Sequence, residues 1–170
     1  DCLLSRGLGD VYKRQEQFDP QLNWGDVEWI KKRWGGKLIL KGIMDAEDAR
    51  LAADSGADAL IVSNHGGRQL DGAPSSISAL PGIVEAAGRD IEVWMDGGVR
   101  SGQDVLKARA LGARGTLIGR AFLYGLGAAG EAGVTRALQI IHKELDVSMA
   151  FCGRTRIDDV GSDILLPGSF

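Results

Sequence analysis

Four short apolar segments alternate with helix-forming segments over most of the chain, and this alternation constrains the fold more than any other feature. The apolar segments span residues 37–43, 59–63, 91–95 and 115–118. Short strands that are apolar almost throughout, separated by helices, are typical of a parallel sheet covered by its own connecting helices. The sequence therefore predicts an α/β fold made of about four strand–helix units.

The connecting helices are predicted from capping residues and apolar periodicity. Typical N-cap residues precede three expected helices, at residues 24–34, 46–54 and 102–111. A fourth helix is expected to begin near Pro81, because proline is favoured at the first helical position. A fifth is expected from about Gly130 to a stop at Gly153, and a polar tail follows it.

Two parallel architectures fit these units: half of a (β/α)8 barrel, or a small doubly wound open sheet. A barrel of ~250 residues allots about 30 residues to each unit, close to the spacing of the predicted strands. The reactive and glycine-rich clusters all follow strand ends, where barrel enzymes place their sites, whereas an open sheet concentrates its site at one switch point. We therefore predict half of a TIM barrel over residues 16–170. Residues 1–15 lack periodicity and are interpreted as a foreign leader.

Composition points away from several classes of partner. The net charge is -3, so charge gives no reason to expect nucleic acid or an anionic membrane as a partner. Cys2 and Cys152 lie at opposite ends of the chain, form no metal-spaced pair, and are interpreted as unpaired thiols. No apolar run approaches the ~20 residues of a membrane span. The sequence predicts neither a metal site nor a nucleic-acid partner.

Glycines and arginines follow the last two predicted strands, in the segments DGGVR at 96–100 and GR at 119–120. Barrels commonly bind phosphate after their last two strands. Glycines let backbone N–H groups approach phosphate oxygens, helix N-termini favour anions, and arginine can bind a phosphate through two hydrogen bonds. We favour a phosphate site over the alternative in which these glycines only shape turns.

A loop with titratable residues follows the strand at 59–63, and it carries His65 and Arg68. An unperturbed imidazole pKa of ~6.5 suits a general base near neutrality, and a guanidinium matches a carboxylate. Lys41 stands at the end of the preceding strand, so its ammonium is expected near the same loop. These residues predict a base beside an anion clamp.

Four segments resemble the FMN-dependent α-hydroxy-acid oxidases and dehydrogenases. They are LILKGI at 38–43, SNHGGRQLDG at 63–72, DGGVRSGQDV at 96–105 and IGRAFLYGL at 118–126, of which SNHGGRQLDG is the most specific. The resemblance runs from about residue 16 to the C-terminus. Within the family it is most similar to the L-lactate dehydrogenase and mandelate dehydrogenase branch.

The resemblance implies FMN as cofactor and an L-2-hydroxy acid, lactate-like, as the substrate that is oxidised to a 2-oxo acid. His65 would be the base, removing either the α-proton or the hydroxyl proton, and Arg68 would hold the substrate carboxylate. The implied FMN-binding residues come from all four strand ends: Lys41, Ser63, Asp96, Gly97, Gly98, Arg100, Gly119 and Arg120.

The family barrel has eight units, so the resemblance implies that this chain is the C-terminal half and lacks the carboxylate that orients the histidine. It leaves the electron acceptor open among a quinone, a cytochrome and oxygen. It also implies a homo-oligomeric parent that is cytoplasmic, with a peripheral position on the inner membrane as the other option. Because a half barrel has two unpaired sheet edges, we expect the isolated chain to associate and to bind FMN weakly.

Two other interpretations stay open at this point. One is a non-catalytic half barrel that binds phosphate or flavin. The other is a different phosphate-binding flavin barrel, such as the flavin type of isopentenyl-diphosphate isomerase. A base and a carboxylate clamp on one loop favour the hydroxy-acid enzymes.

Overall fold

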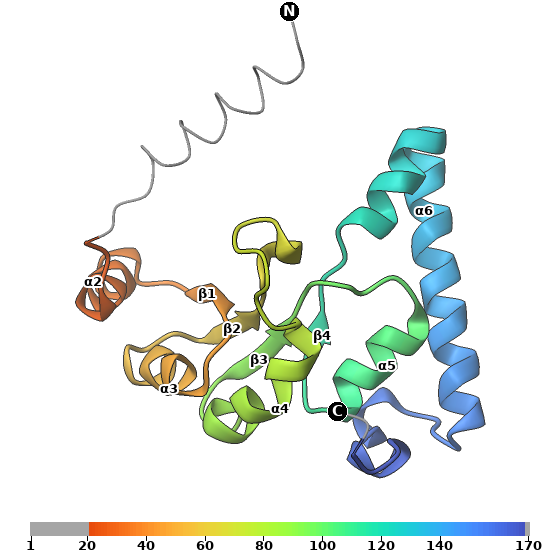
Figure 1. Cartoon of the computed structure of the whole chain (residues 1–170). Coiled ribbons are helices and arrows are strands. Elements are labelled where there is room, and N and C mark those ends of the chain that lie inside the picture. The colour runs from red at the N-terminus through yellow and green to blue at the C-terminus, as the bar shows by residue number, and fades with distance from the viewer. Residues whose placement is uncertain (1–20, 169–170) are drawn as a thin grey trace, which may run out of the picture.

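The computed structural model describes residues 21–168, which form a four-stranded parallel sheet with its helices (Figure 1). The strands are β1 (Ile39–Ile43), β2 (Ala59–Val62), β3 (Glu92–Met95) and β4 (Gly115–Thr116). The helices are α2 (Trp24–Trp34), α3 (Ala46–Asp54), α4 (Ser76–Ala87), α5 (Gly102–Ala110) and α6 (Arg120–Phe151). Short 3-10 helices span His65–Gly67 (η1), Ile157–Asp159 (η2) and Ser162–Ile164 (η3). The leader predicted for residues 1–15 lies outside the described residues.

The strand order decides between the two architectures. The sheet runs β1-β2-β3-β4, and each strand pairs in parallel with the next strand of the chain. Right-handed crossovers between such neighbours place every connecting helix on the same side of the sheet, and α3, α4 and α5 lie together on that side (Figure 1). A doubly wound sheet needs a reversal of strand order. The open-sheet alternative is therefore wrong, and the winding is that of a barrel segment.

The core lies between β2, β3 and the helices α3 and α4. All four residues of β2 are buried, as expected for an inner parallel strand. Leu60 and Val62 belong to the same buried cluster as Leu80 and Ile83 of α4. Full burial of such a side chain contributes about 1.5–3 kcal/mol. This cluster holds the carboxyl ends of the strands at one level, where the predicted site residues stand.

Asp58, just before β2, links α2 to the amino-terminal end of β1. Its carboxylate pairs with Lys31 of α2 and with Lys37 at 2.7 Å, and it accepts a hydrogen bond from the backbone N–H of Leu38 at 2.8 Å. These donors hold the pKa of Asp58 well below its usual range, the hydrogen bond from Lys31 having the largest effect. The strand predicted at 37–43 spans Ile39–Ile43, and the two residues before it contact this carboxylate.

The helix expected to begin near Pro81 begins five residues earlier. Ser75 caps α4, its hydroxyl accepting from the backbone N–H of Ser78. Pro81 thus lies inside the helix, beyond the first turn, where it leaves the carbonyl one turn earlier without its usual backbone donor. Leu80 and Ile83 on the buried face stabilise the helix through that position. The prediction of the start at Pro81 was wrong because a serine cap lay upstream.

The long helix α6 consists of two segments separated by non-helical Ala129 and Gly130. The second segment is the helix predicted from Gly130, and the first was not predicted. The two segments fold against each other (Figure 1). A Cβ on Gly133 would lie 1.8 Å from the carbonyl oxygen of Gly125, so the backbones touch where both residues are glycine. Glycines usually indicate a loop, but in this segment they allow the two parts of α6 to pack closely.

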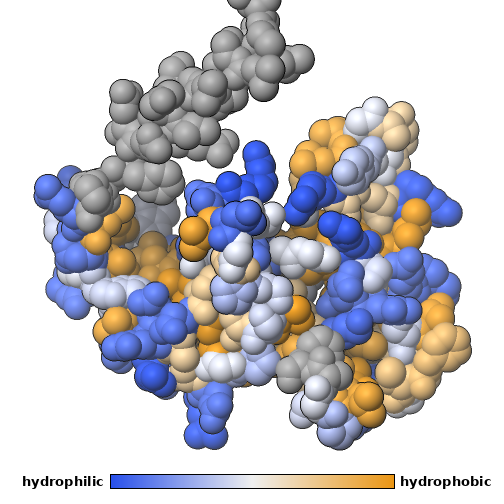
Figure 2. Space-filling model, viewed as in Figure 1, coloured by the Kyte–Doolittle hydropathy of each residue, from blue (hydrophilic) through white to orange (hydrophobic). Residues whose placement is uncertain are grey.

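The predicted polar tail is partly structured. It contains η2 and η3, and Val160 between them is buried against Leu106 and Ala110 of α5. Large apolar side chains remain exposed elsewhere, on α2 and α6 (Figure 2). Trp29 and Trp34 are 64% and 68% exposed and Phe151 is 87% exposed. Burial of the tail thus covers only part of the apolar surface.

Candidate active site

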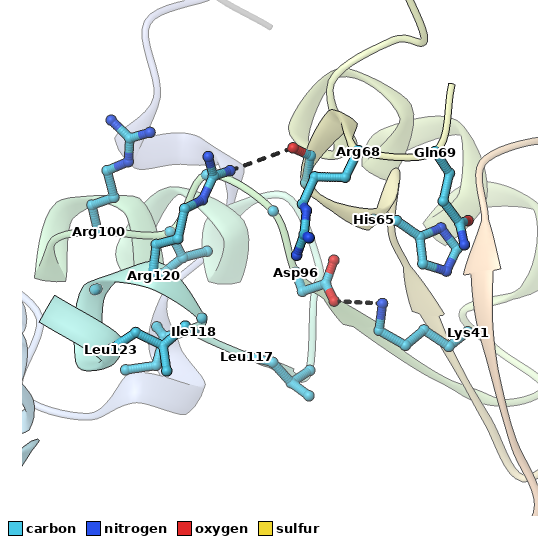
Figure 3. A pocket seen from close by; sticks show the side chains of 16 residues that line it. Lys41, His65, Arg68, Gln69, Asp96, Arg100, Leu117, Ile118, Arg120 and Leu123 are labelled. Carbon is cyan, nitrogen blue, oxygen red and sulfur yellow. Dashed lines mark hydrogen bonds and ion pairs between the residues drawn. The ribbon is translucent and has the colours of Figure 1, made fainter. Parts of the chain in front are cut away.

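A pocket of about 490 Å³ opens at the carboxyl ends of the strands (Figure 3). Its walls come from Lys41 of β1, from the loops after β2, β3 and β4, and from the start of α6. Every residue that the sequence analysis assigned to the site lines this pocket, with the exception of Ser63. The lining comprises Lys41, His65, Gly66, Arg68, Gln69, Asp96, Gly97, Gly98, Val99, Arg100, Leu117, Ile118, Gly119, Arg120, Ala121 and Leu123.

Lys41 stands between two oxygen atoms at the floor of the pocket. Its Nζ pairs with Oδ2 of Asp96 at 2.9 Å and donates to Oγ of Ser63 at 2.8 Å. Ser63 is only 1% exposed, and its hydroxyl oxygen also accepts from the backbone N–H of His65 at 3.1 Å. Ser63 therefore lies behind the pocket wall, where it joins the lysine to the histidine loop. Its predicted contact with the flavin ring stays a prediction.

Asp96 has one engaged and one unengaged carboxylate oxygen. Oδ2 pairs with Lys41, whereas Oδ1 is buried and has no hydrogen-bond partner among residues 21–168. A buried acceptor without a donor is costly. A ligand hydroxyl at this position would satisfy it, which is the kind of group that a ribityl chain carries.

Gly42 is a site residue that the sequence analysis did not identify. It interrupts the pairing of β1 with β2, at a register shift between Lys41 and Ile43, and its φ is +102°. A Cβ at this position would lie 2.9 Å from Cε1 of His65. The imidazole therefore rests on the backbone of β1, and only glycine leaves room for it. The sequence signal for this role was the glycine that directly follows Lys41 near the end of the strand.

Arg68 and Gln69 follow the histidine on the same loop. The guanidinium of Arg68 points toward Asp96, and Gln69 lies beside the imidazole of His65 (Figure 3). Both side chains line the pocket. Arg68 is thus placed to meet an anion close to His65, and Gln69 is a polar lining residue that the sequence analysis left out.

The far end of the pocket combines glycines with a helix N-terminus. Gly97 and Gly98 have φ values of +89° and +80°, which exclude most side chains there. Gly119 is the N-cap of α6 and provides no side-chain cap, so the first N–H groups of α6 remain available at the pocket. Arg120 donates to the carbonyl of Gly66 at 3.4 Å. The unpredicted first segment of α6 thus presents a helix N-terminus after the last strand of the sheet, and barrels commonly bind phosphate at such a position.

The charge of the pocket suits an anionic ligand. Lys41, Arg68, Arg100 and Arg120 line it, against the single carboxylate of Asp96. Arg100 lies on the same side of the pocket as Arg120, away from Lys41 and His65 (Figure 3). The cations are spread along the pocket, so a ligand with a phosphate at one end and a second anion at the other would be matched at both.

A parallel barrel segment with a cationic, glycine-lined pocket at its strand ends defines the class of phosphate-binding TIM barrels. Within that class, the chain belongs to the FMN-dependent dehydrogenase family, whose sequence profile matches residues 6–167. It is 55% identical over 148 residues to an L-lactate dehydrogenase of Caulobacter sp. and 50% identical over 161 residues to one of Actinobacillus pleuropneumoniae. These alignments cover 87% and 94% of this chain but 39% and 42% of the relatives. The chain thus spans about two-fifths of the length of these curated relatives.

Solved structures agree with this assignment. A monotopic membrane protein, (S)-mandelate dehydrogenase, superposes with a TM-score of 0.85 at 41% identity, covering 91% of this chain and 41% of that chain. A mandelate oxidase with 2-hydroxy-phenylacetamide gives 0.79 at 45% identity, covering 82% and 42%. The predicted family and the predicted part-barrel fold are confirmed. Within residues 21–168, no helix is long and apolar enough to cross a membrane.

Proposed function

We propose that this chain carries the base, the carboxylate clamp and the phosphate cradle of an FMN-dependent enzyme that oxidises an L-2-hydroxy acid to the 2-oxo acid. The observation that supports this most directly is the single pocket of Figure 3. His65, Arg68 and the glycines of the phosphate cradle all line it. A substrate carbon and a phosphate-anchored cofactor can therefore meet in the same pocket.

The residues present fit FMN. Gly97, Gly98, Arg100, Gly119 and Arg120 would hold its phosphate through backbone N–H groups and guanidinium groups. Oδ1 of Asp96, which lacks a donor, would accept from a ribityl hydroxyl. Lys41 would place a positive charge beside the ring, and Ser63 retains its hydroxyl proton for the pyrimidine edge. When bound, FMN would accept the two electrons that the substrate loses.

His65 would act on the substrate as a general base, and Arg68 would fix the substrate carboxylate. The imidazole takes a proton from the α-carbon or from the hydroxyl, and an imidazole is suited to this near neutral pH. Arg68 is on the same short loop, so it holds the carboxylate at a set distance from the imidazole. Lys41, paired with Asp96 at 2.9 Å, has a third ammonium hydrogen free to meet negative charge on the ring.

A chimera tests this proposal. The aligned segment of this chain replaces its counterpart in the Caulobacter L-lactate dehydrogenase, and the FMN-loaded protein is mixed anaerobically with L-lactate or L-mandelate. We expect bleaching of the flavin absorbance by at least one of them. If FMN is bound but neither substrate bleaches it, the non-catalytic interpretation is correct instead.

Two variants of the chimera test the residue roles. His65→Ala should slow bleaching by about 10²–10⁴-fold, the range typical of a general base. Arg68→Lys should raise the substrate KM, because the two parallel hydrogen bonds of a guanidinium are lost. Unchanged bleaching in the first variant, or an unchanged KM in the second, contradicts the role assigned to that residue.

The electron acceptor and the location belong to the same proposal. One relative is a monotopic membrane protein, so we propose a peripheral position on the inner membrane with a quinone as acceptor, ahead of a cytochrome or oxygen. We also propose a homo-oligomeric parent. Reoxidation of the reduced chimera by a soluble quinone and by oxygen, measured side by side, distinguishes these acceptors.

A further inference from the structure

The backbone at His65 adopts a conformation that this residue does not favour. Its φ is +56°, and it is the one residue other than glycine with a positive φ among residues 21–168. Such a conformation persists when surrounding contacts enforce it, and it occurs often at functional sites. Gly66 and Gly67 continue the same turn with φ values of +68° and +71°. The direction of the imidazole therefore depends on whatever holds this turn in place.

Asn64 supplies that restraint from both ends of its side chain. Its Oδ1 accepts a hydrogen bond from the backbone N–H of Gly66 at 3.0 Å, closing a turn around His65. Its Nδ2 donates to the carbonyl of Pro74 at 3.1 Å, across the loop. The backbone carbonyl of Asn64 accepts from the N–H of Gly67 at 3.0 Å. One side chain thus bridges the histidine turn and the segment that leads into α4.

Asn64 also touches the phosphate cradle. A Cβ on Gly97 would lie 3.2 Å from Oδ1 of Asn64 and 2.8 Å from Oγ of Ser76. Ser76 is 2% exposed, and its hydroxyl accepts from the backbone N–H of Asn64 at 3.4 Å. The cradle loop therefore packs directly on the residue that closes the histidine turn. Both ends of the pocket share this support.

We propose that Asn64 is a positioning residue that sets the direction of the His65 imidazole relative to the phosphate cradle. This proposal rests on the proposed function of His65 as a base. Asn64 does not line the pocket, so it acts through the turn and meets neither substrate nor FMN. Its amide is needed because one oxygen acceptor and one nitrogen donor serve two separate backbone groups.

Two substitutions separate the two hydrogen bonds. Asn64→Asp keeps an oxygen that can accept from Gly66 but cannot donate to Pro74. Asn64→Ala removes both hydrogen bonds. Asn23→Ala is the matched control, because Asn23 makes a similar local contact, accepting from the backbone N–H of Gly25 at 2.9 Å, at the distant start of α2.

The first measurement is flavin reduction in the chimera. Because a misplacement of about 1 Å can cost ~10²-fold in rate, we expect Asn64→Ala to slow reduction by about 10- to 100-fold. Asn64→Asp should recover only part of that loss, because it keeps the acceptor for Gly66 but turns a carboxylate oxygen toward the carbonyl of Pro74. Asn23→Ala should leave the rate unchanged. The FMN dissociation constant should change less than the reduction rate in all of them, because Asn64 does not line the pocket.

The second measurement needs neither FMN nor activity. Trypsin is added to the 170-residue chain, and cleavage after Arg68 is compared with cleavage after Arg89, which is also exposed. Release of the turn in Asn64→Ala should raise cleavage after Arg68 alone. General unfolding would raise both sites together.

The outcomes are separable. The proposal is overturned if Asn64→Ala leaves both the reduction rate and the cleavage ratio unchanged, or if it raises cleavage at both sites while FMN affinity falls in step with the rate. If the chimera with Asn64 intact is not reduced by either hydroxy acid, the proposed function fails. In that case the cleavage ratio still tests whether Asn64 holds the turn.

Discussion

Replacement of Gly42 by alanine tests whether the imidazole of His65 rests on the backbone of β1. A Cβ at Gly42 would lie 2.9 Å from Cε1 of His65, whereas carbon atoms pack at about 3.5–4.0 Å. The ring must therefore move by at least roughly 0.6 Å. The φ of +102° adds strain for any residue with a Cβ, on the order of 1–3 kcal/mol.

We expect Gly42→Ala to slow anaerobic reduction of the flavin in the chimera by about 10- to 100-fold, because near 1 Å of misplacement can cost ~10²-fold. The assay is the bleaching of flavin absorbance after rapid mixing with substrate. Thermal unfolding of the same variant measures the cost in stability.

Gly35→Ala is the matched control for Gly42→Ala. Gly35 also has a positive φ, +69°, but a Cβ there would meet no atom within 4 Å. It should therefore lose stability and retain the reduction rate. If Gly42→Ala slows reduction no more than Gly35→Ala does, the imidazole does not depend on contact with β1 and the reasoning is refuted.

Three further predictions concern stability and assembly. Asp58→Asn should lower the unfolding temperature at neutral pH. The pKa of Asp58 is lower in the folded than in the unfolded protein, so its ionised carboxylate stabilises the fold above the unfolded pKa of about 3.9, and this contribution is lost as the pH falls through the folded pKa. The unfolding temperatures of the variant and the parent should therefore converge in acid. Gly133→Ala should weaken FMN binding, because the added Cβ pushes the start of α6 away from the pocket, and it should cost about 1–3 kcal/mol in stability. Gly127→Ala is the control: its Cβ would meet no atom within 4 Å, so FMN affinity should not change. Equal FMN affinities in the two variants would contradict this prediction. The isolated chain should associate, because Trp29, Trp34 and the outer edge of β1 are exposed; a monomer by light scattering that binds FMN tightly would contradict this.

The sheet was predictable because its signal is local. β2 and β3 are short apolar runs followed by the polar residues Ser63 and Asp96, and caps such as Ser101 stand directly before their helices. β4 was predicted over 115–118 but spans only Gly115–Thr116. The start of α4 was predicted wrongly because proline, although favoured in the first turn, also occurs inside a helix. In α4 the Ser75 cap and the buried face compensate for the hydrogen bond that Pro81 cannot donate. The first segment of α6 was not predicted because it packs on the second segment through Gly125 and Gly133. The spacing of apolar residues within the first segment does not reveal such a contact.

The candidate site was predictable for similar reasons. His65, Arg68 and Asp96 stand at strand ends, and parallel strands bring their ends together. Gly42 was missed because it contacts His65 across space, and Asn64 was missed because its hydrogen bond to the carbonyl of Pro74 lies across the loop. A bulge in β1 and an amide that joins two backbone segments have no periodic signature. Their importance becomes visible only when the distances between loops are known.

The unbroken order of the strands also bears on how the protein folds. Residues paired across neighbouring strands, such as Ile39 with Ala59 and Ala59 with Glu92, lie only one strand–helix unit apart in the sequence. Each new pairing therefore closes a short loop, and closure entropy grows with loop length. Parallel pairing is still slower than the formation of a helix, because the whole crossover must close before two strands can pair. The sheet can nevertheless assemble one unit after another along the chain, and the pocket of Figure 3 is complete only when the start of α6 comes into place.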